Sequence, residues 1–64
     1  MKVRYDPDTD TLSVVFKDSP IVESDEATRG LIVDLDADGS VGSLELLDAS
    51  ERVEQPLSVE LVAS

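Results

Sequence analysis

The chain has 64 residues, with neither cysteine nor histidine, and its fifteen acidic residues against five basic ones give a formal net charge of −10. This length makes one small domain, and the missing residue types exclude disulfides and disfavour a structural zinc site. The acidic excess disfavours binding to nucleic acid or to an anionic membrane, since both favour clusters of Lys and Arg.

Two strands joined by a tight turn are predicted at the start of the chain, over residues 2–5 and 11–16. In both, apolar and polar side chains alternate, as in strands with one buried face. Between them, Pro7 presets the backbone for a turn and Asp6 suits its first position. So short a connection makes the two strands antiparallel.

The next segment breaks the hydrogen-bond ladder at Pro20, which has no N–H to donate. Residues 21–28 fit a strand at the edge of the sheet, where exposed charges protect against pairing with other chains. A turn of helix over residues 24–28 is the alternative, and we favour the edge strand. Gly30 marks the turn into the strand that follows.

The clearest pattern lies in residues 30–48, where two apolar runs flank an acidic turn. Residues 31–36 alternate with a period of two, as does the run after Ser40. Between the runs, Asp38 and Gly39 form the dipeptide that supplies the positive φ of a tight hairpin turn. We therefore predict a central hairpin around which the rest of the chain packs.

The same residues match the calcium-loop pattern D-x-D-x-D-G-x5-E, through Asp34, Asp36, Asp38, Gly39 and Glu45. This spacing would supply several of the oxygens that calcium requires. An EF-hand also requires a helix on each side, whereas the segment before Asp34 alternates like a strand. We expect Asp34 and Asp36 to be solvent-facing strand positions and predict no metal ligand. A metal- or salt-responsive domain using the Asp34–Glu45 acidic loop is the alternative to our main expectation for the chain, a non-enzymatic protein-interaction module.

The C-terminal part begins with a pattern typical of a capping box. Asp48 would accept a hydrogen bond from the N–H of Glu51, whose side chain would reach back to Asp48. The helix must be short, because Pro56 ends it near Glu54. Residues 57–62 alternate and favour a last strand. A helix there is the alternative, which their valines disfavour.

These elements predict a mainly β fold for residues 1–64, a single antiparallel meander-like sheet of about four to six short strands with a short C-terminal helix turn. A second apolar set points away from the core face and is our candidate interface, to be covered by a second subunit or the segment after Asp48. The candidate interface residues are Val15, Ile32, Val41 and Leu47. The predicted core face holds Val3, Tyr5, Leu12, Val14, Phe16, Leu31, Val33, Leu35, Leu44 and Leu46.

Size and composition also bear on assembly and activity. So short a chain buries only about 60% of its unfolded surface, and oligomerisation is the remaining common means of stabilising it. We therefore expect a homo-oligomer, in the simplest case a dimer. Without histidine or cysteine the usual general base and the best nucleophiles are missing, so we expect neither an enzyme nor a cofactor. No apolar run spans a membrane and the start passes directly into a strand, so we expect a cytoplasmic protein.

The acidic composition has two interpretations. A surface adapted to high salt keeps its carboxylates hydrated and their repulsion screened, and we favour this halophilic interpretation. The alternative is a basic protein partner that is steered to the chain by charge.

Three stretches, residues 5–12, 30–39 and 44–50, resemble a small prokaryotic family catalogued as domain of unknown function 2283. The likeness covers residues 1–53, and the order and spacing of the stretches carry it. The resemblance implies a compact β-rich domain and a role as the antitoxin-like half of a two-protein module. The family commonly has an aromatic residue where Ser13 or Val14 stands here, and a helical C-terminal segment.

Overall fold

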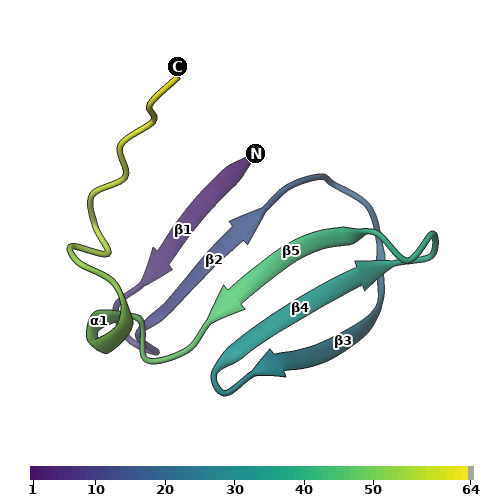
Figure 1. The fold of residues 1–64 in the computed structure, drawn as a ribbon, viewed down its shortest axis with the longest axis horizontal. Coiled ribbons are helices and arrows are strands. Elements are labelled where there is room, and N and C mark those ends of the chain that lie inside the picture. Colours follow the sequence, from purple (N-terminus) through teal and green to yellow (C-terminus); the bar gives the residue numbers. More distant parts are fainter. Residues whose placement is uncertain (64) are drawn as a thin grey trace.

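The computed structural model describes residues 1–63, which form one antiparallel sheet of five strands followed by a short helix (Figure 1). The spatial order of the strands is β1-β2-β5-β4-β3. This confirms the predicted mainly β fold with a short C-terminal helix. The elements are β1 (Lys2–Asp6), β2 (Thr11–Val15), β3 (Ile21–Thr28), β4 (Leu31–Asp36), β5 (Val41–Leu46) and α1 (Ala49–Arg52).

The connections place β1 and β3 at the two edges of the sheet. Strands β3, β4 and β5 form a meander, and the β1–β2 hairpin joins it through β5 rather than through β3. Residues 16–20 therefore cross one end of the sheet from β2 to β3 (Figure 1). Where this crossing begins, the N–H groups of Phe16 and Lys17 both donate to the carbonyl oxygen of Gly42, at 2.8 and 3.3 Å.

The predicted edge strand and the predicted central hairpin are both confirmed. All eight residues of β3 are exposed, as suits an edge. Between β4 and β5, Gly39 has a φ of 81° and its N–H donates to the carbonyl of Asp36 at 3.0 Å. At the β3–β4 turn Gly30 has a φ of 79°. Both glycines occupy the left-handed region, which a residue with a Cβ enters only at a cost.

The start of α1 differs from the predicted capping box. Asp48 has a φ of 54° and makes no side-chain cap, because a capping side chain requires an extended backbone at that residue. Asp10 of the β1–β2 turn takes this role. Its carbonyl accepts from the N–H of Ala49 at 2.9 Å, and its carboxylate accepts from the N–H and hydroxyl of Ser50 at 3.0 and 2.7 Å. The cap therefore comes from a residue 40 positions away.

The chain after α1 also departs from the prediction. The helix ends at Arg52, short of Glu54, and Val53 is extended. Residues 57–62 form no strand, so the last predicted strand is wrong for the single chain. Alternation makes a strand only where a neighbour pairs with the backbone. Among residues 57–62 the N–H of Ser58 donates to the carbonyl of Gln55, and no bond joins this stretch to a strand. In the described residues no helix is long and apolar enough to cross a bilayer.

Candidate interaction surface

The strand register gathers apolar side chains on one face of the sheet. Val14 lies opposite Val3 of β1 and Leu44 of β5, and Leu44 lies opposite Val33 of β4. Residues directly opposite each other on antiparallel strands share a face, so one apolar row crosses four strands. A second apolar row lies beside it on the same four strands, formed by Tyr5, Leu12, Leu46 and Leu31. We call this surface the apolar face, formed by Val3, Tyr5, Leu12, Val14, Leu31, Val33, Leu35, Leu44 and Leu46.

Within residues 1–63 no second layer covers the apolar face (Figure 1). All nine of its residues remain partly exposed, and the neighbouring Phe16 is 43% exposed. In the described chain the only buried hydrophobic residue apart from glycine is Ala49, and no large side chain is fully enclosed. A single-layer sheet thus presents to solvent the surface that would form the core of a two-layer domain.

The total surface agrees with this picture. A folded monomer of this mass is expected to expose about 4,000 Å². The chain exposes 4882 Å² for its 6.9 kDa. The chain thus exposes roughly 900 Å² more than a monomer of its mass is expected to expose.

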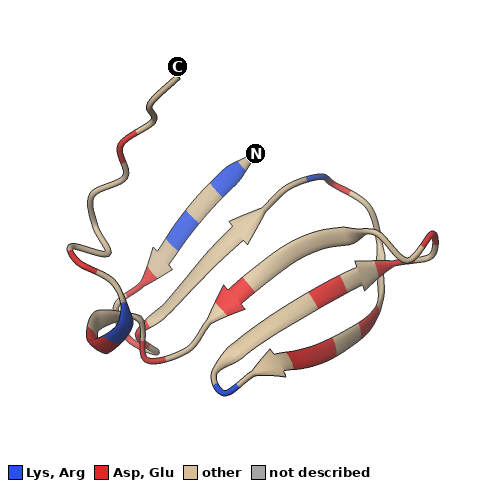
Figure 2. Ribbon diagram, viewed as in Figure 1, with Lys and Arg blue, Asp and Glu red and all other residues tan. Residues whose placement is uncertain are grey.

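The two edge strands carry opposite charge (Figure 2). On β1, Lys2 and Arg4 are exposed, whereas β3 carries three acidic residues and no basic one. Among residues 1–63 the one ion pair joins Lys17 to Asp36, at 2.8 Å. The two cations of β1 therefore have no acidic partner within the described chain.

On the opposite, polar face, the carboxylate of Asp34 is tied to two neighbouring strands. Ser24 of β3 and Ser43 of β5 donate their hydroxyls to its two oxygens, each at 2.6 Å. Asp34 is only 8% exposed, so its predicted solvent-facing position is wrong. The physical reason is that the two hydroxyls replace water at a buried carboxylate.

Asp36, 6% exposed, is likewise covered rather than solvent-facing. Its carboxylate accepts from the Ser19 hydroxyl at 3.3 Å and from the N–H groups of Asp38 and Ser40 at 3.0 and 3.1 Å. The hydrogen bond from Lys17 lowers the pKa of this carboxyl, burial opposes the change, and the two N–H groups reinforce it. Asp36 thus fixes the hairpin turn and the crossing segment together.

The acidic residues of the calcium-loop pattern are therefore not assembled as a cation site. Asp34 and Asp36 are engaged by hydroxyls, N–H groups and Lys17, and Glu45 lies on the polar face, opposite Ser13. In the part of the chain that the structure describes, no three His, Cys, Asp or Glu side chains are grouped to hold a metal ion.

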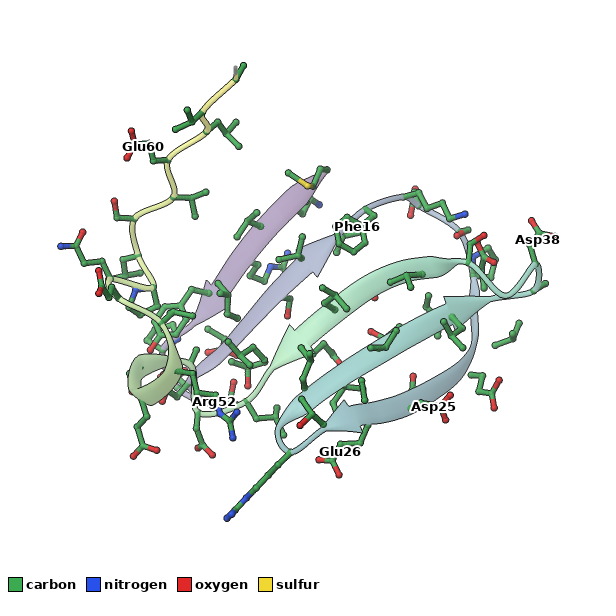
Figure 3. The ribbon with its side chains drawn as sticks, in the orientation of Figure 1. Phe16, Asp25, Glu26, Asp38, Arg52 and Glu60 are labelled. Carbon is green, nitrogen blue, oxygen red and sulfur yellow. The ribbon has the colours of Figure 1, made fainter. Side chains whose placement is uncertain are left out.

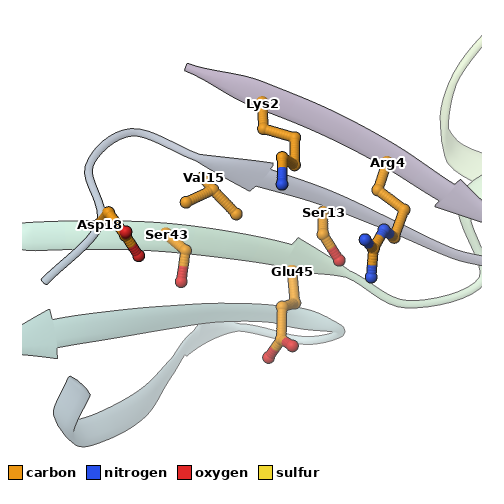
Figure 4. Close-up of a pocket in the computed structure, with 7 residues that line it drawn as sticks. All are labelled: Lys2, Arg4, Ser13, Val15, Asp18, Ser43 and Glu45. Atoms are coloured by element: carbon orange, nitrogen blue, oxygen red, sulfur yellow. The ribbon is translucent and has the colours of Figure 1, made fainter. Parts of the chain in front are cut away.

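An open depression of about 340 Å³ lies over β1, β2 and β5 on the polar face (Figure 4). Lys2, Arg4 and Glu45 point into the same space from strands β1 and β5. Small-molecule sites are usually enclosed and largely apolar, and this depression is neither. It offers charge for a surface contact. Its lining residues are Lys2, Arg4, Ser13, Val15, Asp18, Ser43 and Glu45.

The four predicted interface residues do not meet in one apolar patch. Val15 lines the depression just described, and Leu47 lines a neighbouring one that also includes Glu45. Ile32 lies opposite Glu45, while Val41 lies opposite Leu35 beside an irregularity in the β4–β5 ladder. Their role at an interface stays a prediction. The larger apolar surface is the apolar face, which the sequence analysis predicted to be the core. The short length of the chain was the signal that this face would remain uncovered, because 64 residues supply no second layer.

A hydrogen-bonded corner holds α1 beside one end of the apolar face. The Tyr5 hydroxyl donates to the Asp10 carboxylate at 2.6 Å. This bond raises the pKa of Tyr5, with burial and the nearby carboxylates adding to the effect. The same bond and those from Ser50 lower the pKa of Asp10, against a smaller effect of burial. The Asp10 carboxylate is occupied by hydrogen bonds from Tyr5 and Ser50, so we assign this corner a structural role.

Comparison with known proteins gives one match. The family model described as "Protein of unknown function (DUF2283)" matches residues 2–50, from β1 to the first turn of α1. No curated protein and no solved structure matches the chain.

Proposed function

For this chain, which belongs to the DUF2283 family of unknown function, we propose a non-catalytic protein-interaction module that self-associates through the apolar face. The observation that carries the proposal is that nine apolar side chains on one face of the sheet have no covering layer in the part of the chain that the structure describes. Stable domains bury such a face against a second layer. A second copy supplies a layer of matching shape and the same apolar character.

The excess surface area is close to what one standard interface removes from each partner. Standard interfaces remove about 800 Å² from each partner, close to the excess of roughly 900 Å² found here. Two sheets packed face to face form a sandwich with an inner layer about 10 Å thick. The acidic residues of β3 then lie at its rim, where charge is usual in interfaces.

Charge makes this association dependent on salt. Each chain has a formal charge of −10, so two copies repel each other at low ionic strength. Screening by KCl weakens the repulsion and leaves the apolar attraction in place. The dimer is therefore expected to strengthen as salt rises, whereas a complex with a basic partner weakens.

A basic protein partner is the second candidate, and the acidic edge strand favours it. All eight residues of β3 are exposed, and Glu23, Asp25 and Glu26 lie along it. An exposed strand edge offers unpaired backbone groups to a partner strand, and the carboxylates select a basic one. In the antitoxin-like form of this role, the acidic edge masks the basic surface of a small partner protein.

Molar mass measured by light scattering tests self-association. We expect a molar mass of twice the 6.9 kDa of the chain. On dilution the dimer should dissociate, and in molar KCl this should happen only at lower protein concentrations. A single-chain mass in both low salt and molar KCl, up to about 1 mM protein, would rule out the proposal. Binding to a basic protein by a monomer would favour the second candidate instead.

A further inference from the structure

We propose that residues 57–62 of one copy add a sixth strand to the sheet of the other copy, along the free edge of β1. This inference rests on the proposed self-association and identifies a second contact that the two copies exchange. Swapping an identical segment between protomers is a low-cost route to a symmetric dimer.

The first observation is the free edge of β1. This strand pairs only with β2, so its other side has no neighbouring strand in the described chain. Along that edge Val3 and Tyr5 belong to the apolar face, and Lys2 and Arg4 alternate with them on the polar face. An added strand is thus offered backbone hydrogen bonds, apolar contacts on one side and positive charge on the other.

The second observation is the segment itself. Leu57, Val59 and Leu61 are 83%, 58% and 81% exposed, a high exposure for three alternating apolar side chains. The segment leaves α1 and runs opposite in direction to β1, with Glu60 far out along it (Figures 1 and 3). Its composition, with period-two alternation and two valines, is that of a strand without a partner.

The alternation of the segment matches that of β1. An antiparallel pairing that places Leu57, Val59 and Leu61 on the apolar face brings Glu60 to the polar face. There it lies opposite Lys2 in one register and opposite Arg4 in the next that keeps the faces matched. Opposite charges at facing positions of neighbouring strands attract each other, so either register supplies Glu60 with a cation.

Charge also selects β1 over the other free edge. Alongside β3, with the faces matched, Glu60 would lie on the side of Glu26, and its apolar neighbours would lie on the side of Glu23 and Asp25. Like charges at facing positions destabilise strand pairing. The unpaired cations of β1 remove this repulsion and are the natural counterpart of the segment's single charge.

The backbone at the start of the segment favours another copy over its own β1. Gln55 has a positive φ of 53°, and Pro56 follows it with a fixed φ and no N–H. In the described residues, the segment after this turn makes no backbone hydrogen bond to β1. In a face-to-face dimer the edge of the second sheet lies across the interface, and each copy can fill the edge of the other.

Cysteine cross-linking tests the pairing directly, because the chain has no cysteine of its own. Chains carrying only Lys2→Cys or Arg4→Cys are each mixed with chains carrying only Glu60→Cys and are oxidised. Facing Cβ atoms of antiparallel strands are about 4.5–5.5 Å apart, within reach of a disulfide. We expect one of the β1 variants to form a mixed covalent dimer, and a matched Glu26→Cys chain to form none. Equal linkage of Glu60→Cys to β1 and to Glu26→Cys would refute the proposal.

A double variant separates exchange from closure within one chain. Arg4→Cys/Glu60→Cys and Lys2→Cys/Glu60→Cys are expected to give a covalent dimer on a non-reducing gel. A bridged single chain would show that the segment folds back on its own β1 and would overturn the exchange. Molar mass is read in parallel. A non-covalent dimer without any cross-link refutes the exchange alone, whereas a monomer refutes self-association as well.

Charge reversal provides a readout without cysteine. Glu60→Arg places a cation against β1 and is expected to weaken the dimer by roughly five- to thirtyfold. Adding Arg4→Glu or Lys2→Glu to it restores the attraction and with it the affinity. The control, Glu54→Arg, makes the same change in net charge outside the segment and leaves the dimer unweakened. An effect of Glu54→Arg equal to that of Glu60→Arg would contradict the pairing.

Discussion

Truncating Leu44 should weaken self-association while leaving the sheet folded. Leu44 is central on the apolar face, between Val14 of β2 and Val33 of β4. It is partly exposed in the single chain, so only part of its burial is completed in the dimer. Burying a whole leucine side chain contributes about 1.5–3 kcal/mol. Most of Leu44 is already buried in the single chain, so we take about a third of this value as the contribution of dimer formation.

The change enters twice in a symmetric dimer. Two copies of Leu44→Ala therefore cost about 1–2 kcal/mol of association free energy, which is about a 5- to 30-fold increase in Kd. Sedimentation equilibrium at several concentrations in molar KCl measures this Kd. Circular dichroism of the same samples checks that the sheet remains folded.

Ile32→Ala is the matched control, because Ile32 is also partly exposed but lies on the polar face, opposite Glu45. We expect Ile32→Ala to lower the thermal stability of the chain about as much as Leu44→Ala does, and to leave the Kd of the dimer unchanged. If Ile32→Ala raises Kd and Leu44→Ala does not, the copies meet through the smaller apolar set that includes Val15, and the reasoning from the apolar face fails.

Four further outcomes follow from the turns, the carboxylates and Tyr5. Gly39→Ala should lower stability by about 1 kcal/mol and the melting temperature by roughly 4–8 °C, because its Cβ meets no atom within 4 Å and only the φ of 81° resists it; Ser40→Ala is the control. The lowered pKa of Asp36 means that its stabilisation is present above the ordinary 3.8 and is lost as pH falls through the lowered value, so Asp36→Asn should lose less stability on acidification than the parent. The raised pKa of Tyr5 acts at the other end of the pH range: its stabilisation is present below the ordinary 10.0 and is lost as pH rises through the raised value, so Tyr5→Phe should lose less stability above 10.0 than the parent. For either residue, an equal loss of stability in variant and parent would contradict the assignment. Millimolar calcium should give no more heat in calorimetry than magnesium, and a saturable excess would revive the acidic loop as a metal site.

The sequence predicted the local features of this fold because their causes are local. Alternation identified the strands, and the positive φ that Gly39 adopts is a property of its own turn. The pairing of β2 with β5 was not predictable in the same way, since it joins residues 12–15 to residues 43–46. The acidic β3 did hold a signal, because a strand with exposed charge on both faces belongs at an edge and not between β2 and β4.

The candidate surface was predictable in content but not in role. The apolar face was identified as a core, since alternation reports which side chains avoid water and not what covers them. The buried positions of Asp34 and Asp36 depend on hydroxyls and a lysine that other segments supply. The same holds for the cap from Asp10, whose bonds to Ser50 span 40 residues. Such partners appear only when the register is known.

The strand order also has a consequence for synthesis on the ribosome. The β1–β2 hairpin leaves the ribosome before β5, and the inner edge of β2 stays bare until β5 has been made, because β5 is the strand that pairs with this edge. During this delay the nascent chain presents an apolar hairpin with an open edge, the kind of intermediate that aggregates. The acidic residues of β3 and of the β4–β5 turn emerge in the meantime, and their like charges oppose close contact between two such chains.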